Sequence, residues 1–104
     1  MAQREVIWTE TAARQRREIL IYWRERNNSA SYSEKLIKLI QKKINLIVRY
    51  PEYGKNVLFT DTKTSAMGHY SIYYKVRDDE IIITAFLDNR QDPAKLLKKL
   101  KNQK

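Results

Sequence analysis

The stretch YSIYYKVRDDEIIITAFL, residues 70–87, holds two apolar runs separated by a short charged segment. Residues Tyr70–Arg77 and Glu80–Leu87 are rich in Tyr, Ile, Thr and Phe, which favour β-strands. The charged residues between them predict a tight hairpin turn without glycine. Strands joined by so short a turn pair antiparallel, so this stretch predicts the centre of an antiparallel sheet.

Successive side chains of a strand point to opposite faces, so alternation predicts which residues of these strands share a face. The more apolar face should pack against helices, and it comprises Tyr70, Ile72, Tyr74, Val76, Ile81, Ile83, Ala85 and Leu87. The other face should be open, and it comprises Tyr73, Lys75, Arg77, Ile82, Thr84, Phe86, Asp88 and Arg90. Its basic and aromatic side chains suit phosphates and stacked bases. A solvated face without a ligand is the alternative, but two large apolar side chains on it favour a covering partner.

Upstream of this stretch, the sequence predicts a short strand and two helices. Val6–Trp8 reads as a strand, Thr9 as an N-cap, and Glu10–Arg26 as a helix with apolar residues at three- and four-residue spacing. Residues 27–30 form a polar break. Two helices separated by so short a break form an antiparallel hairpin.

The second helix should begin with a capping box of Ser31 and Glu34 and run to about Arg49. Pro51 then ends it. Short strands are expected at Val57–Phe59 and Lys63–Met67. The predicted core spans these elements, and it comprises Trp8, Ile19, Trp23, Leu36, Ile40, Ile44, Ile72, Ile83 and Leu87.

Together these elements predict an α+β fold, with an N-terminal strand and an antiparallel helical hairpin packed on one face of a twisted antiparallel sheet. The length of 104 residues indicates a single domain, residues 1–104, which ends in a basic tail at residues 94–104. Asp92 and Pro93 suit the start of a short helix in that tail.

The charge balance indicates the chemistry of the partner. Lys and Arg number 21 against 12 Asp and Glu, which gives a net charge of +9. Such a chain suits a polyanion or an acidic protein. There is no signal-peptide pattern and no apolar run of membrane-spanning length, so we expect a cytoplasmic protein without membrane contact.

Few residues suit catalysis in this sequence. There is no Cys and one His, which argues against thiol chemistry and a His-based metal site, and no glycine-rich phosphate loop occurs. We therefore predict no metal, no cofactor and no small-molecule cofactor partner. His69 is the one side chain that titrates near neutral pH without a large shift, so it is the default acid or base. An incidental surface histidine is the alternative.

The sequence resembles toxins of the RelE/ParE superfamily, the toxic half of bacterial type II toxin–antitoxin pairs. The segments that carry the resemblance span about residues 4–93, and they are REVIWTETAARQRREILIYW, YPEYG, HYSIYYKV and IIITAFLDNRQDP. RelE-like members are similar to ribonucleases that cut mRNA on the ribosome with several Lys and Arg and a C-terminal Tyr. Ser71 stands where those ribonucleases place an Arg, and the C-terminal segment has no Tyr. ParE-like members resemble the same fold without this set and poison DNA gyrase.

The resemblance implies a toxin, for which we predict mRNA cleavage on the ribosome. The expected partners are an acidic antitoxin, encoded by the neighbouring reading frame, and the ribosome with mRNA. The alternatives are a non-catalytic inhibitor of DNA gyrase and an inactive homologue that binds the antitoxin. The predicted catalytic residues are Arg90, His69, Lys75 and Lys63, the nucleic-acid-binding residues are Tyr73 and Arg77, and the antitoxin-binding residues are Ile82 and Phe86.

Overall fold

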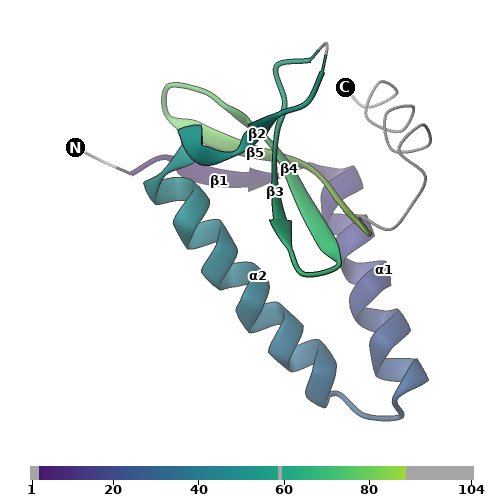
Figure 1. Ribbon diagram of the computed structural model, residues 1–104. Helices are drawn as coiled ribbons and strands as arrows, with labels where there is room; N and C mark the ends of the chain where they lie inside the picture. The colour runs from purple at the N-terminus through teal and green to yellow at the C-terminus, as the bar shows by residue number, and fades with distance from the viewer. Residues whose placement is uncertain (1–2, 59, 89–104) are drawn as a thin grey trace.

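A mixed five-stranded sheet organises the structure, a computed structural model that describes residues 3–58 and 60–88 (Figure 1). The elements in chain order are β1 (Glu5–Trp8), α1 (Glu10–Arg26), α2 (Ser31–Arg49), the 3₁₀ turn η1 (Pro51–Tyr53), β2 (Lys55–Asn56), β3 (Lys63–Met67), β4 (Tyr70–Val76) and β5 (Glu80–Asp88). The strand order is β1-β5-β4-β3-β2. Strands β2 to β5 pair antiparallel, whereas β1 runs parallel to β5. The predicted α+β class is confirmed, with one parallel pair added to the antiparallel sheet.

The two helices begin differently. Helix α1 has the predicted cap, because Thr9 Oγ1 accepts a hydrogen bond from the Ala12 amide at 3.1 Å. The capping box predicted at α2 is wrong, because Ala30 is the N-cap and makes no side-chain hydrogen bond there. Ser31 is already helical, and its amide donates instead to Ser29 Oγ at 3.1 Å.

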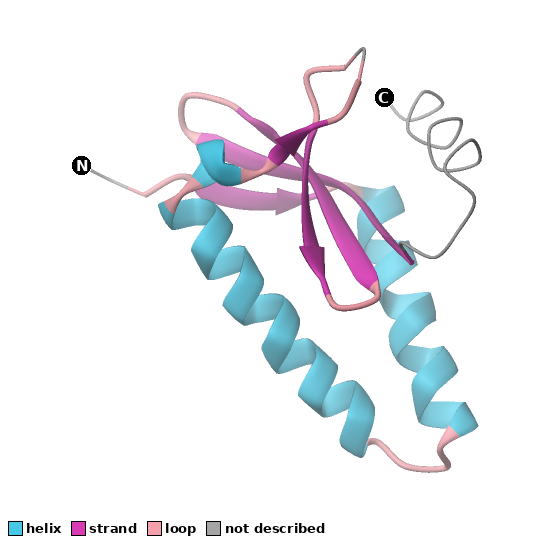
Figure 2. Cartoon of the chain, viewed as in Figure 1, coloured by secondary structure: helices cyan, strands magenta, loops and turns pink. Residues whose placement is uncertain are grey.

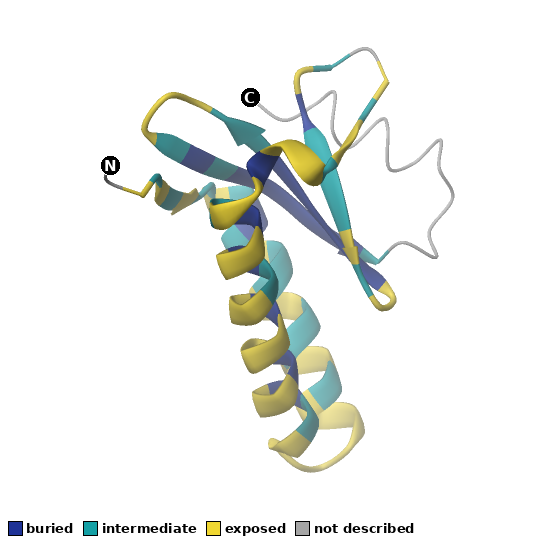
Figure 3. Cartoon of the chain, turned by 60° about the vertical axis from the view of Figure 1, so that its left-hand side comes forward, coloured by how far each residue is buried: buried dark blue, intermediate teal, exposed yellow. Residues whose placement is uncertain are grey.

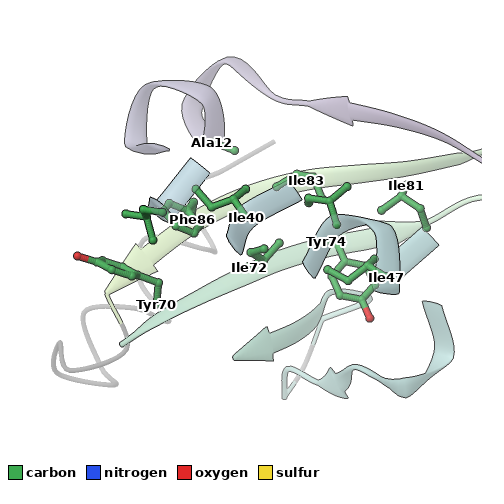
Figure 4. Close-up of a cluster of buried hydrophobic side chains, with 11 residues drawn as sticks. Ala12, Ile40, Ile47, Tyr70, Ile72, Tyr74, Ile81, Ile83 and Phe86 are labelled. Carbon is green, nitrogen blue, oxygen red and sulfur yellow. The ribbon is translucent and has the colours of Figure 1, made fainter. Parts of the chain in front are cut away.

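Both helices lie on the same side of the sheet, as Figure 2 shows. Ser33 Oγ of α2 donates to the Leu20 carbonyl of α1 at 2.7 Å and links the two helices. The main core lies between this hairpin and the sheet (Figure 4), and its buried members are Ala12, Leu36, Ile40, Ile44, Ile47, Tyr70, Ile72, Tyr74, Ile81, Ile83 and Phe86. The predicted core residues Trp8, Ile19 and Trp23 pack against it while partly buried.

A β-bulge in β5 changes which side chains face the helices. Tyr74 pairs with Ile83 but Tyr73 pairs with Ala85, so Thr84 is an extra residue in β5. An extra residue reverses the alternation for the rest of the strand. Phe86 therefore lies in the main core. Ala85 and Leu87 lie instead with Tyr73 in a second buried cluster, against which Val57 packs.

These positions correct the predicted faces. Phe86 was expected on the open face but is completely buried, and Leu87 was expected in the main core but lies in the second cluster. The faces predicted for β4 are right, because Tyr70, Ile72 and Tyr74 are all in the main core.

The segment between α2 and β3 also differs from expectation. The strand predicted at Val57–Phe59 is shifted, because β2 is Lys55–Asn56 and Val57 belongs to the following loop, where its amide donates to the Thr62 carbonyl at 2.9 Å. Among the residues that the structure describes, the helices lack the combined length and apolar character of a membrane-spanning segment. Arg90 and the tail predicted at residues 94–104 lie outside the described residues.

Candidate functional site

One predicted catalytic residue, Lys75, and one predicted nucleic-acid contact, Arg77, meet at one corner of the sheet. Lys75 lies on the face of β4 that points away from the helices, and Arg77 directly follows this strand, which ends at Val76. Both reach Asp61 in the β2–β3 loop. The Lys75 Nζ–Asp61 Oδ1 distance is 3.4 Å, and the Arg77 Nη2–Asp61 Oδ2 distance is 3.1 Å. We call these three residues the Asp61 cluster.

Asp61 reduces the positive charge that this corner offers to a phosphate. Desolvation is the largest influence and raises the pKa of Asp61, but the hydrogen bonds and charges of Arg77 and Lys75 together outweigh it. The pKa therefore lies below the ordinary value of 3.8, and the side chain is a carboxylate at neutral pH. One anion already sits between the two cations. Because 59% of the Asp61 side chain is exposed, the cluster is solvated and these ion pairs are weak.

Tyr73 was expected to stack a base on this face, and the structure buries it. Only 7% of the residue is exposed, because it pairs with Ala85 and Thr64 in neighbouring strands and lies in the second cluster. Burial raises the pKa of the Tyr73 hydroxyl. Its ring has no open face of the kind that a stacked base requires.

The predicted acid–base and phosphate groups do not come together. His69 is exposed in the two-residue turn between β3 and β4, where Gly68 has φ of 63° as a type II′ turn requires. Lys75 lies six residues further along β4, roughly 20 Å away at ~3.3 Å per residue. Lys63 pairs with Tyr74, which faces the helices, so it lies on the opposite face from Lys75. Its Nζ donates to Asn56 Oδ1 at 2.9 Å.

The two predicted antitoxin contacts, Ile82 and Phe86, also lie on opposite faces of the sheet. Phe86 is fully buried against the helices. Ile82 is partly buried on the face of the sheet that points away from the helices, between its strand partners Ile7 of β1 and Lys75 of β4. Ile7 is 37% exposed, so Ile7 and Ile82 form a small apolar pair beside the Asp61 cluster.

A hollow lies elsewhere on the molecule, between α2 and the first strand and helix. A cavity of about 520 Å³ is lined by Gln3, Arg4, Val6, Trp8, Gln41, Ile44, Asn45, Val48 and Arg49. A second cavity of about 310 Å³ is lined by Trp8, Arg16, Leu20, Ile37, Ile40, Gln41 and Ile44. They share Trp8, Gln41 and Ile44 and so form one continuous groove, which we call the α2 groove.

The α2 groove combines an apolar floor with positive charge. The guanidinium of Arg16 lies 4.3 Å from the centre of the Trp8 ring, in cation–π contact. Arg4 and Arg49 also line the groove, and none of its lining residues is acidic. Sequence reasoning missed this site. The available signal was the width of the apolar stripe on α2, which includes Ile37, a residue that is 51% exposed.

The structure shows no candidate metal-binding site among the residues that it describes. Among residues 3–58 and 60–88, no group of three or more His, Cys, Asp or Glu side chains is placed to hold a metal ion.

Comparison with known proteins identifies the protein family to which this chain belongs. The family described as "ParE toxin of type II toxin-antitoxin system, parDE" matches residues 6–93. The chain therefore belongs to the ParE toxin family, and it is a type II toxin–antitoxin toxin. A solved structure described as "Chromosomal ParDE TA system from P. aeruginosa" has a TM-score of 0.72 with 16% sequence identity, and the match covers 83% of this chain and 96% of that chain. No curated protein matches the sequence.

Proposed function

We propose that this toxin inhibits DNA gyrase by binding to it and does not cleave mRNA. The observation that carries the proposal is the dispersal of the predicted catalytic groups. Within the described residues, His69 and Lys75 lie at opposite ends of β4, and Lys63 lies on the opposite face of the sheet. Phosphoryl transfer by general acid–base catalysis requires these groups within hydrogen-bond reach of one phosphate. Membership of the ParE family points in the same direction.

Induction of the toxin in growing cells should stop DNA synthesis first. A toxin that acts on gyrase leaves translation running in the first minutes, because ribosomes and existing mRNA are untouched. The measurement is pulse labelling of DNA and protein, together with a supercoiling assay of purified host gyrase on relaxed plasmid. We expect loss of supercoiling and of DNA label.

The same assay contains the outcomes that contradict the proposal. Cleaved mRNA with early loss of protein label would establish the ribonuclease instead. Normal growth with unchanged supercoiling would indicate an inactive homologue that retains only antitoxin binding. A toxin with Lys75 and His69 both replaced by alanine is the matched control, because a binding inhibitor does not need an acid–base pair at the exposed His69 and the partly exposed Lys75.

We further propose that the α2 groove binds the antitoxin through an acidic, amphipathic segment. Three arginines around an apolar floor without acidic residues complement such a segment in charge and in polarity. The net charge of +9 favours rapid encounter with an acidic partner. This surface differs from the predicted antitoxin contacts Ile82 and Phe86, of which Phe86 is fully buried.

Truncation of Ile37 should weaken antitoxin binding about tenfold. Ile37 lines the groove but is half exposed in the free toxin, so its replacement by alanine removes contact area with the partner and little from the toxin core. Loss of about two buried methylene groups corresponds to roughly this factor. Stopped-flow mixing with the protein of the adjacent reading frame measures it, and most of the change should appear in the dissociation rate.

Leu39→Ala is the matched control. Leu39 lies on the same helix, is 40% exposed, and lines neither cavity. Equal effects of the two truncations, or none from Ile37→Ala, would place the antitoxin on another surface.

A further inference from the structure

The turn that follows α2 carries two stacked tyrosines on the surface. The rings of Tyr50 and Tyr53 are 5.3 Å apart between centroids and 7° from parallel. Tyr53 is 77% exposed and Tyr50 is 42% exposed. Tyr50 covers one face of the Tyr53 ring, so the other face is open to solvent. Figure 3 shows this segment as mostly exposed at the upper end of α2.

Buried groups beneath the rings hold this turn in place. The Tyr74 hydroxyl donates to the Pro51 carbonyl at 2.8 Å, and Tyr74 and Pro51 are both buried. Backbone hydrogen bonds join the Tyr53 amide to the Tyr50 carbonyl at 3.2 Å and the Tyr50 amide to the Leu46 carbonyl at 2.8 Å. A surface ring on such a base loses little conformational freedom when it binds a ligand.

The side chains beside the stack are mainly basic. Arg49 precedes it, Lys55 follows it, and both are exposed. Lys63 packs against the same turn, because its Cβ lies 3.2 Å from the position that a Cβ of Gly54 would occupy. Glu52 is the one carboxylate in the turn. Within the described residues, neither Arg49 nor Lys55 forms a salt bridge.

We propose that Tyr53 is a stacking platform for one base of a single-stranded nucleic acid, with Lys63, which packs against the same turn, close to the adjoining phosphate. An open aromatic face next to cations is the combination by which proteins hold unpaired strands without reading their sequence. A duplex cannot use this platform, because its bases are already stacked on each other. The surrounding cations favour this ligand over an apolar protein surface, which would leave them unpaired.

This site adjoins the α2 groove at Arg49 but is built on other aromatic residues, and it does not depend on gyrase inhibition. Tyr50 and Tyr53 are not among the residues that line the groove. The ligand is defined here by its unpaired base and its phosphates, which single-stranded DNA and RNA share.

Fluorescence anisotropy with a labelled deoxythymidine oligonucleotide of about 12 nucleotides tests the proposal, since such sites span ~4–16 nucleotides. Tyr53→Ala should weaken binding about 5- to 150-fold, the range expected for loss of one base–aromatic stack. Tyr53→Phe should bind like the unaltered toxin, because it keeps the ring. Tyr53→Leu should behave like Tyr53→Ala, because it keeps apolar bulk without a flat face.

An abasic oligonucleotide of the same length isolates the stacking contact. It keeps the phosphates, so Tyr53→Ala should leave its affinity unchanged. Tyr22→Ala is the matched protein control, because Tyr22 is 52% exposed on α1, away from this turn. A matching RNA oligonucleotide distinguishes RNA from DNA as the preferred strand.

Three results would overturn the proposal. The first is unchanged affinity of Tyr53→Ala for the DNA and RNA strands with bases. The second is an equal loss of affinity for the abasic strand, which would indicate a purely electrostatic surface. The third is tighter binding of a duplex than of either single strand. Because all the variants alter an exposed side chain, circular dichroism should show them folded alike.

Discussion

Phe86→Ala should destabilise the toxin by about 3–5 kcal/mol, a large share of the total stability of a domain of this size. The Phe86 ring is completely buried and stacks on Tyr70 with 5.4 Å between ring centroids. Removal of the ring leaves a cavity between α1 and the sheet that its neighbours fill only in part. Urea unfolding followed by tryptophan fluorescence measures the loss.

Ile82→Ala is the matched control for this prediction. Simple alternation places Ile82 and Phe86 on the same face, whereas the bulge at Thr84 separates them. Ile82 is only partly buried, so its truncation should cost at most about 1.5 kcal/mol. Similar costs for the two variants would mean that β5 has no bulge and that Phe86 is not in the core.

Gly54→Ala should cost about 2–4 kcal/mol, although its backbone conformation suits any residue. Gly54 has φ of −67° and ψ of 152°, which is ordinary extended backbone. A Cβ there would overlap the Tyr74 hydroxyl oxygen and come within 2.9 Å of its ring carbon Cζ. Since Tyr74 is buried, the ring or the turn must move, and its hydrogen bond to Pro51 is lost. Thermal and urea unfolding report the change.

Two controls separate this steric effect from a general effect of replacing glycine. Gly68→Ala should cost about 1–2 kcal/mol from its φ of 63° alone, because no atom lies within 4 Å of the added carbon. Tyr74→Phe removes the overlapping oxygen. In that background, the cost of Gly54→Ala should fall by at least about 1 kcal/mol, as expected for residues in contact. Strictly additive costs would show that Gly54 and Tyr74 do not collide.

The sequence was sufficient for the element order because strong local signals coincide with the fold. The Tyr70–Arg77 and Glu80–Leu87 runs became β4 and β5, and Thr9 caps α1 as expected. The bulge has no such signal, since Thr84 is an ordinary strand residue and only the pairing with β4 reveals it as extra. This one extra residue, which the sequence does not reveal, places Phe86 in the main core and Leu87 in the second cluster.

The candidate site was harder to predict because it depends on contacts between distant segments. Alternation correctly placed Lys75 on the face of β4 that points away from the helices, and Arg77 directly follows that strand. It had no means of bringing Asp61 to them, because that residue lies in a loop whose path is fixed by tertiary packing. The α2 groove likewise arises where β1 and α2 approach each other. Single-element periodicity reports which face of a helix is apolar, but not whether a neighbour covers it.

The position of β5 between β1 and β4 has a consequence for how the chain is made. Glu5 pairs with Glu80, so β1 leaves the ribosome long before β5, the strand it pairs with in the sheet, has been synthesised. Such long-range pairing slows folding, because a large loop must close before the contacts that stabilise it can form. A nascent chain that ends before β5 lacks the central strand that pairs with both β1 and β4, so its five-stranded sheet is incomplete. Toxic activity should therefore emerge late in synthesis, which gives an antitoxin already present in the cell time to meet each new molecule.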